Sequence, residues 1–159
     1  MMHFRDPAAD GELLAELKDE SVLAPDAIAR IDALLGSPES GALNDFLLAG
    51  AAIIPEPAWL TWLIRRHDCH RFGRVAWHDE AAGWARGGVP PDGNLPYRRA
   101  ADGAILVAVL RPDRRAATAA RLLPATADPP APRLHWAAAT LREMRELRSA
   151  WERRPLDPS

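Results

Sequence analysis

Residues 105–110 form an uninterrupted apolar run, Ile-Leu-Val-Ala-Val-Leu, shortly after an Asp-Gly pair at residues 102–103. Asp-Gly supplies the positive φ angle of a tight turn, so the flanking segments, 95–99 and 104–110, are predicted to form a β-hairpin. A strand that is apolar on both faces is typical of the middle of a sheet that is covered on each side. The run therefore predicts a covered central strand.

The residues before this hairpin divide into two parts. Up to about residue 71, apolar side chains recur at helical spacing, and proline and glycine residues separate the segments. We expect four helices here, over roughly 11–20, 25–35, 42–49 and 57–70. Residues 73–78 alternate as a short strand does, and the Gly- and Pro-rich residues 79–94 indicate a loop with at most one helical turn.

The residues after the hairpin predict a helix over 112–123, a short strand over 133–136 and a closing helix over 137–151. The expected fold class is α+β, with an N-terminal helical subdomain packed on a small α/β subdomain that has a mostly antiparallel sheet. The helical subdomain spans 10–71 and contains two degenerate helix-turn-helix repeats. The α/β subdomain spans 72–152, and residues 153–159 are expected to be a frayed tail.

Composition narrows the classes of function. The chain has 159 residues and a single cysteine, Cys69, which excludes an internal disulfide and fits a reducing compartment. No apolar run approaches the roughly 20 residues of a membrane span, and the N-terminus lacks the pattern of a signal peptide. We therefore expect a cytoplasmic protein that is not inserted in a membrane.

Charge is unevenly distributed along the chain. Residues 1–60 contain eleven acidic and three basic residues, whereas residues 61–159 contain eleven acidic and seventeen basic ones. The last predicted helix carries Arg142, Arg145 and Arg148, as a nucleic-acid-binding helix could. Glutamates interleave with these arginines, which is typical of a solvated face with helical ion pairs, and the isoelectric point is near 6.2. We do not expect a nucleic-acid partner.

The order of elements resembles the N-terminal domain of type II secretion and type IV pilus assembly ATPases, the MshEN-type domain. The resemblance covers roughly residues 10–152. It rests on the helical repeats, on Leu95-Pro96-Tyr97 before the hairpin, on the apolar strand followed by Arg-Pro-Asp, and on the closing segment Ala139 to Met144. The loop between Trp77 and Leu95 departs from the family pattern.

The resemblance implies a docking module. In the family, this domain tethers an ATPase to an inner-membrane platform protein, and a subset binds cyclic di-GMP. The ATPase itself is absent from this sequence, because no stretch fits G-x-x-x-x-G-K-[ST] and the only lysine, Lys18, has no glycine-rich loop. We therefore expect a non-catalytic protein-docking or regulatory domain without a cofactor, whose partner is a platform protein or an ATPase.

A diverged cyclic di-GMP receptor is the first alternative. Four positions match the family's two binding repeats: Gly11, Leu14, Leu43 and Leu47. Alanine, Ala9 and Ala42, stands where each repeat has the arginine that would pair with phosphate or guanine. The leucines are equally what a helical core requires.

A small metal-dependent enzyme is the second alternative. His67 and His70 are three residues apart on a predicted helix and share a face, and His78 lies downstream. The same residues also suit a polar helix end, where the helix dipole favours a histidine. Cys69 lies beside these histidines, but adjacency in sequence does not assemble a catalytic dyad.

Trp84 lies in the predicted loop, two residues before Arg86. Interface hot spots favour both residue types, so the pair is a candidate anchor for a protein partner. The alternative is that Trp84 caps the sheet.

Overall fold

The computed structural model describes residues 7–22, 25–35, 43–49, 54–85, 88–123 and 133–153. Its sheet has three strands in the order β1-β2-β3. Strand β1 (Leu95–Arg99) pairs antiparallel with β2 (Ile105–Val109), and β2 pairs parallel with β3 (Leu134–Ala138). The predicted α+β class is confirmed, with one antiparallel and one parallel strand pair.

The hairpin and the central strand form where the sequence predicts them. Gly103 has a φ of +87°, and the Asp102 carboxylate accepts the N–H of Ala104 at 3.0 Å, which closes the turn. All five residues of β2 are buried. An Asp-Gly turn thus places the fully apolar strand between its two neighbours.

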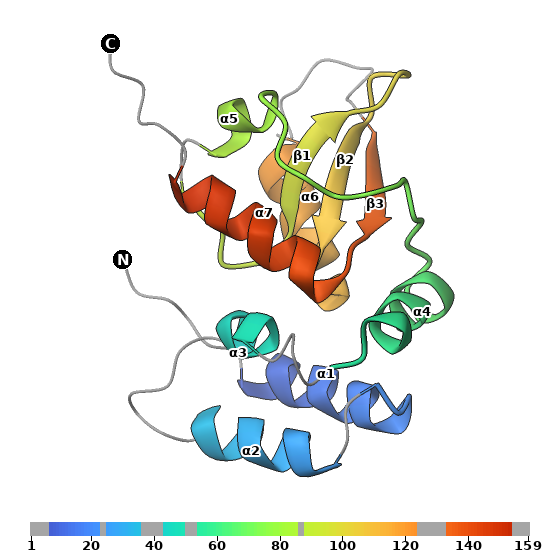
Figure 1. The fold of residues 1–159 in the computed structure, drawn as a ribbon, viewed down its shortest axis with the longest axis vertical. Coiled ribbons are helices and arrows are strands. Elements are labelled where there is room, and N and C mark those ends of the chain that lie inside the picture. Colours follow the sequence, from blue (N-terminus) through green and yellow to red (C-terminus); the bar gives the residue numbers. More distant parts are fainter. Residues whose placement is uncertain are drawn as a thin grey trace.

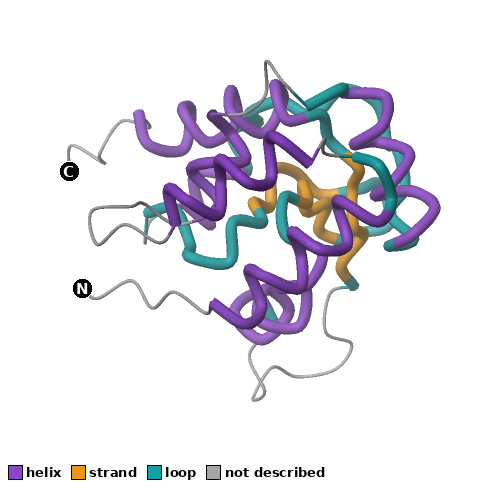
Figure 2. Tube along the Cα trace, turned by 90° about the horizontal axis from the view of Figure 1, so that it is seen from below, coloured by secondary structure: helices purple, strands orange, loops and turns teal. Residues whose placement is uncertain are grey.

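Helices cover both faces of this sheet (Figure 1). A 3₁₀ turn (Pro112–Arg114) and α6 (Arg115–Leu122) connect β2 to β3 on one face, and α7 (Leu141–Arg153) lies on the other. The buried residues of α7 include Leu141, Met144, Leu147 and Trp151, which follow helical spacing. A second view shows the strands between helices on either side (Figure 2).

The first four helices of the described segments lie close to the ranges that the sequence predicts: α1 (Pro7–Asp19), α2 (Pro25–Leu35), α3 (Leu43–Ala49) and α4 (Glu56–Arg66). Helix α1 ends in a Schellman motif, in which Val22 N–H bonds to Leu17 C=O and Ser21 N–H bonds to Lys18 C=O. Ser21 takes the left-handed position of that motif, with a φ of +57°. The motif turns the chain at Val22, which is buried.

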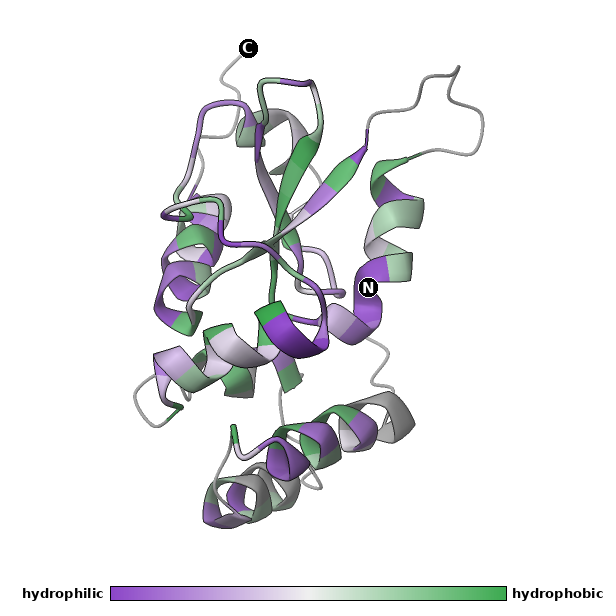
Figure 3. Ribbon diagram, turned by 90° about the vertical axis from the view of Figure 1, so that its right-hand side faces the viewer, coloured by the Kyte–Doolittle hydropathy of each residue, from purple (hydrophilic) through white to green (hydrophobic). Residues whose placement is uncertain are grey.

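One hydrophobic cluster runs through α1, α3, α4, the sheet and α7. Hydropathy colouring shows hydrophobic residues along the sheet and helices striped in both colours (Figure 3). The helical and α/β parts therefore share a core, and the division at residues 71 and 72 stays a prediction. Of the expected tail 153–159, Arg153 is the last residue of α7, and residues 154–159 lie outside the described segments.

The strand predicted at residues 73–78 is wrong. This segment crosses the face of the sheet as irregular chain toward the short helix α5 (Ala81–Trp84) (Figure 1). Val75 is buried, and its N–H donates to the Glu143 carboxylate at 2.9 Å instead of to a strand. Alternation of apolar and polar side chains indicates an extended chain with one buried side. A segment that crosses the face of a sheet can meet this condition without the ladder of hydrogen bonds that defines a strand.

Candidate functional site: the groove between α1 and α4

Of the four positions that match the cyclic di-GMP repeats, three lie in the hydrophobic core and one lies on the surface. Leu14, Leu43 and Leu47 are at most 2% exposed and belong to the hydrophobic core. Gly11 is exposed on α1, and a Cβ atom placed there meets nothing within 4 Å. No close backbone approach requires glycine at this position, and helix packing accounts for the three leucines.

The three histidines of the metal hypothesis lie in different surroundings. His67 contacts Glu16, the His70 ring lies 6.0 Å from that of Phe72, and the His78 ring lies 6.2 Å from that of Tyr97. Within the described segments, no group of three or more His, Cys, Asp or Glu residues is placed to hold a metal ion. The geometry gives the metal-dependent alternative no support.

Cys69 is 1% exposed, and burial raises the pKa of its thiol to about 11. The thiolate is the nucleophilic form, so this cysteine is a core residue that is protonated at neutral pH.

Trp84 is half-buried and packs against the hydrophobic core from α5. The Arg99 guanidinium lies 5.5 Å from the centre of its ring, a cation–π contact with the edge strand β1. Arg86 lies outside the described segments. These contacts favour the reading in which Trp84 caps the sheet, while its role as a partner anchor stays a prediction.

Glu16 joins α1 to α4 through three side chains. Its Oε1 atom lies 2.7 Å from His67 Nε2, accepts the Trp62 indole N–H at 3.2 Å and lies 3.3 Å from Arg66 Nε. Burial lowers the pKa of His67 below its ordinary value, and the Glu16 carboxylate only partly opposes this effect. One carboxylate therefore fixes α1 against the end of α4.

A groove of about 390 Å³, open to solvent, lies beside this contact. Its described lining consists of Glu20, Val22, Pro57, Ala58, Thr61, Trp62, Arg65 and Arg66. The floor is apolar and the rim is charged. Arg65 makes no hydrogen bond or ion pair with the described residues, whereas Arg66 lies near both Glu16 and Glu20.

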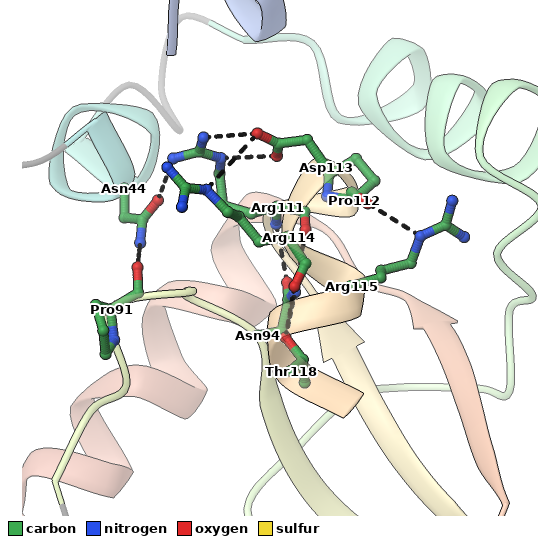
Figure 4. A network of polar contacts seen from close by, with 9 residues as sticks. All are labelled: Asn44, Pro91, Asn94, Arg111, Pro112, Asp113, Arg114, Arg115 and Thr118. Atoms are coloured by element: carbon green, nitrogen blue, oxygen red, sulfur yellow. Dashed lines mark hydrogen bonds and ion pairs between the residues drawn. The ribbon is translucent and has the colours of Figure 1, made fainter. Parts of the chain in front are cut away.

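A buried polar network, which sequence reasoning missed, lies between α3 and the chain that follows β2 (Figure 4). Arg111 is 3% exposed and binds both carboxylate oxygens of Asp113, at 2.9 and 2.8 Å, and the side-chain oxygen of Asn44 at 3.0 Å. Asn44 in turn donates to Pro91 C=O at 3.0 Å. The network ties α3 to the end of the central strand.

Asn94 completes this network. Its side-chain oxygen accepts the N–H groups of Leu110 and Arg111, both at 2.9 Å, and its amide donates to Arg111 C=O and to the Thr118 hydroxyl. The side chain is fully buried, and all four of its hydrogen-bonding positions are used. Its role is to hold the chain where β2 ends and the 3₁₀ turn begins.

A second polar cluster surrounds Glu143. Thr140 and Glu143 form a capping box at the start of α7, in which each side chain bonds to the backbone N–H of the other. The Glu143 carboxylate also accepts hydrogen bonds from both terminal nitrogens of Arg71 and from the backbone N–H of Val75. Thr-Leu-Arg-Glu before an apolar helical pattern is the sequence signal that could have predicted this cap.

Among the residues that the structure describes, no helix combines the length and the apolarity that crossing a bilayer requires. Comparison of the chain with family models, with curated proteins and with solved structures finds no match.

Proposed function

We propose that this chain is a non-catalytic protein-docking or regulatory domain of the cytoplasm, of the kind found at the N-terminus of secretion and pilus ATPases. Its partner is the cytoplasmic part of an inner-membrane platform protein, or a separate ATPase. The observation that carries the proposal is the groove between α1 and α4, which combines an apolar floor with the guanidinium of Arg65, and this guanidinium pairs with none of the described residues. Apolar surface and arginine are enriched where proteins bind one another.

The buried polar groups give the proposal further support. Arg111, Asn94 and Glu143 have the burial and the convergent contacts that often mark an active site. Each of them is fully engaged in joining elements of the fold to one another. This leaves surface recognition as the function that the described side chains serve best.

The test is capture of the full chain's partners from its native cells. The tagged protein is expressed at its natural level, cross-linked in the cells and purified, and the captured proteins are identified by mass spectrometry. We expect enrichment of a platform protein or an ATPase of a secretion or pilus system over a tag-only control. Repeated enrichment of neither, under conditions in which those proteins are present in the lysate, contradicts the proposal.

A calorimetric titration with cyclic di-GMP separates this proposal from the receptor alternative. We expect no heat of binding at micromolar concentrations, because the matched leucines are core residues and both arginines are replaced by alanine. Micromolar or tighter binding would instead support a second-messenger receptor.

A further inference from the structure

We propose that the groove between α1 and α4 binds one amphipathic helix of the partner protein, and that this helix places a carboxylate against Arg65. The inference rests on the proposed docking function and names the surface and the partner's chemistry. The groove lies between the turn that follows α1, at Glu20 and Val22, and one face of α4.

The groove is held open by contacts of Glu16, which is not itself one of the described lining residues. Glu16 bonds Trp62 and lies against His67 and Arg66, so the spacing of α1 and α4 is set before any partner arrives. The Schellman motif at Ser21 fixes the adjoining turn. A partner therefore meets a preformed surface and loses little free energy in ordering it.

The shape favours a helix over a small molecule. Sites for small molecules enclose most of the ligand's surface, whereas this groove is open to solvent. Beyond the groove, α4 continues the same surface through Ile64, which is 40% exposed. Pro57, Thr61, Ile64 and Arg65 follow the spacing of one helical face, so α4 presents a stripe about two and a half turns long. A second helix lying along that stripe can place its apolar residues in the groove.

The charge at the rim favours an acidic partner. Arg65 is exposed and makes no contact with a described carboxylate, and the Arg66 side chain is 60% exposed. Glu20 is the only carboxylate in the described lining, and it lies 3.9 Å from Arg66. A carboxylate carried by the partner would pair with Arg65, the cation of the groove that no described carboxylate contacts.

The first experiment uses two synthetic helical peptides of about 18 residues, since shorter ones are marginal helices. Both carry leucines at i, i+3, i+4 and i+7, flanked by glutamates in one peptide and by lysines in the other. Each is titrated into the isotopically labelled full chain and followed by NMR. We expect the acidic peptide to shift the amides of Val22, Ala58 and Thr61 and the Trp62 indole N–H. We expect the basic peptide to bind at least fivefold more weakly, because its charges repel Arg65.

Two substitutions with matched controls test the residues. Arg65→Glu is expected to reverse the preference between the two peptides, whereas Arg145→Glu, at an exposed arginine on α7, is expected to leave it unchanged. Ile64→Ser is expected to lower the affinity for the acidic peptide about tenfold, as the truncation of an apolar anchor residue does. Phe72→Ser is its control, because Phe72 is 41% exposed and lies elsewhere. All four side chains are exposed, so the variants are expected to fold, which their NMR spectra check.

The outcomes separate this inference from the proposed function. Equal binding of the two peptides, or shifts confined to another surface, overturns the groove assignment. Capture of a platform protein or an ATPase that Arg65→Glu and Ile64→Ser leave unchanged also overturns it, while docking itself stands. Loss of capture in these two variants, with capture retained in Arg145→Glu and Phe72→Ser, supports both.

Discussion

Replacing Asn94 with alanine tests the role of the buried polar network. The substitution removes the partner of three backbone groups, the N–H groups of Leu110 and Arg111 and the C=O of Arg111. The Thr118 hydroxyl keeps its bond to Arg114 C=O and is not counted. Each buried backbone group that loses its partner costs about 1–3 kcal/mol. The low end of that range applies, because the space left by the side chain can admit a water molecule.

We therefore expect Asn94→Ala to lower the free energy of unfolding by about 3–5 kcal/mol, a large part of the roughly 5–15 kcal/mol of a typical domain. With an m-value of about 2 kcal/mol per molar urea, the midpoint falls by about 2 M. Urea unfolding followed by circular dichroism and by tryptophan fluorescence measures it, and coincidence of the two curves checks two-state behaviour.

Asn44→Ala is the matched control in the same network. It removes the partner of Pro91 C=O and one bond of Arg111, whose guanidinium is still held by Asp113. We expect a loss of about 1–2 kcal/mol. Two results would refute the assignment of Asn94 as the main support of the chain between β2 and the 3₁₀ turn. One is a loss of unfolding free energy below about 1 kcal/mol in Asn94→Ala, and the other is a larger loss in Asn44→Ala than in Asn94→Ala.

Three further predictions concern pH and backbone conformation. Burial lowers the pKa of His67, so the unfolded chain binds the proton more readily than the folded chain does. Stability should therefore fall as pH drops below about 6.5. Urea midpoints measured between pH 7.5 and pH 5 should fall less in His67→Gln than in the unaltered protein. Burial opposes ionisation of Glu143, but Arg71 and the N–H groups of Thr140 and Val75 outweigh it and keep its pKa below the ordinary value. Its contribution is therefore present above about pH 4.3 and lost as pH falls below that, and Glu143→Gln should show lower stability at pH 7 and a flatter acid limb. Ser21→Gly removes the strain of a left-handed non-glycine residue and should stabilise the protein by about 1 kcal/mol, seen as a melting temperature raised by about 2–4 °C; an unchanged or lower value would contradict the helix end described here.

The pattern of apolar residues predicted most of the elements, because each of them buries one face or, in β2, both faces. The hairpin at Asp102-Gly103, the covered strand at 105–109 and the amphipathic α7 all follow from local pattern. The parallel pairing of β3 did not follow, since it depends on where α6 returns the chain. The segment 73–78 was misread because burial of Val75 against α7 gives the same alternation as a strand.

The candidate site was harder to predict because its features are contacts between distant residues. Glu16 and Trp62 are 46 positions apart, and Asn44 and Arg111 are 67 apart. Nothing local marks Glu16 as the partner of Trp62, Arg66 and His67 at the end of α4. Nor does the sequence mark Arg65 as the arginine of the groove that pairs with none of the described residues. The histidines at 67, 70 and 78 suggested a metal site because they are close in sequence. In the fold they contact different neighbours.

The separation of these contacts has a consequence for how the chain folds. The hairpin closes over a few residues and can form early, on the microsecond scale of such turns. The Arg71–Glu143 pair joins residues 72 positions apart, and closing so long a loop is slow. We expect α7 and the helical layer to dock in the last kinetic steps, so that a ribosome-bound chain still lacking residue 143 holds a formed hairpin with one open face.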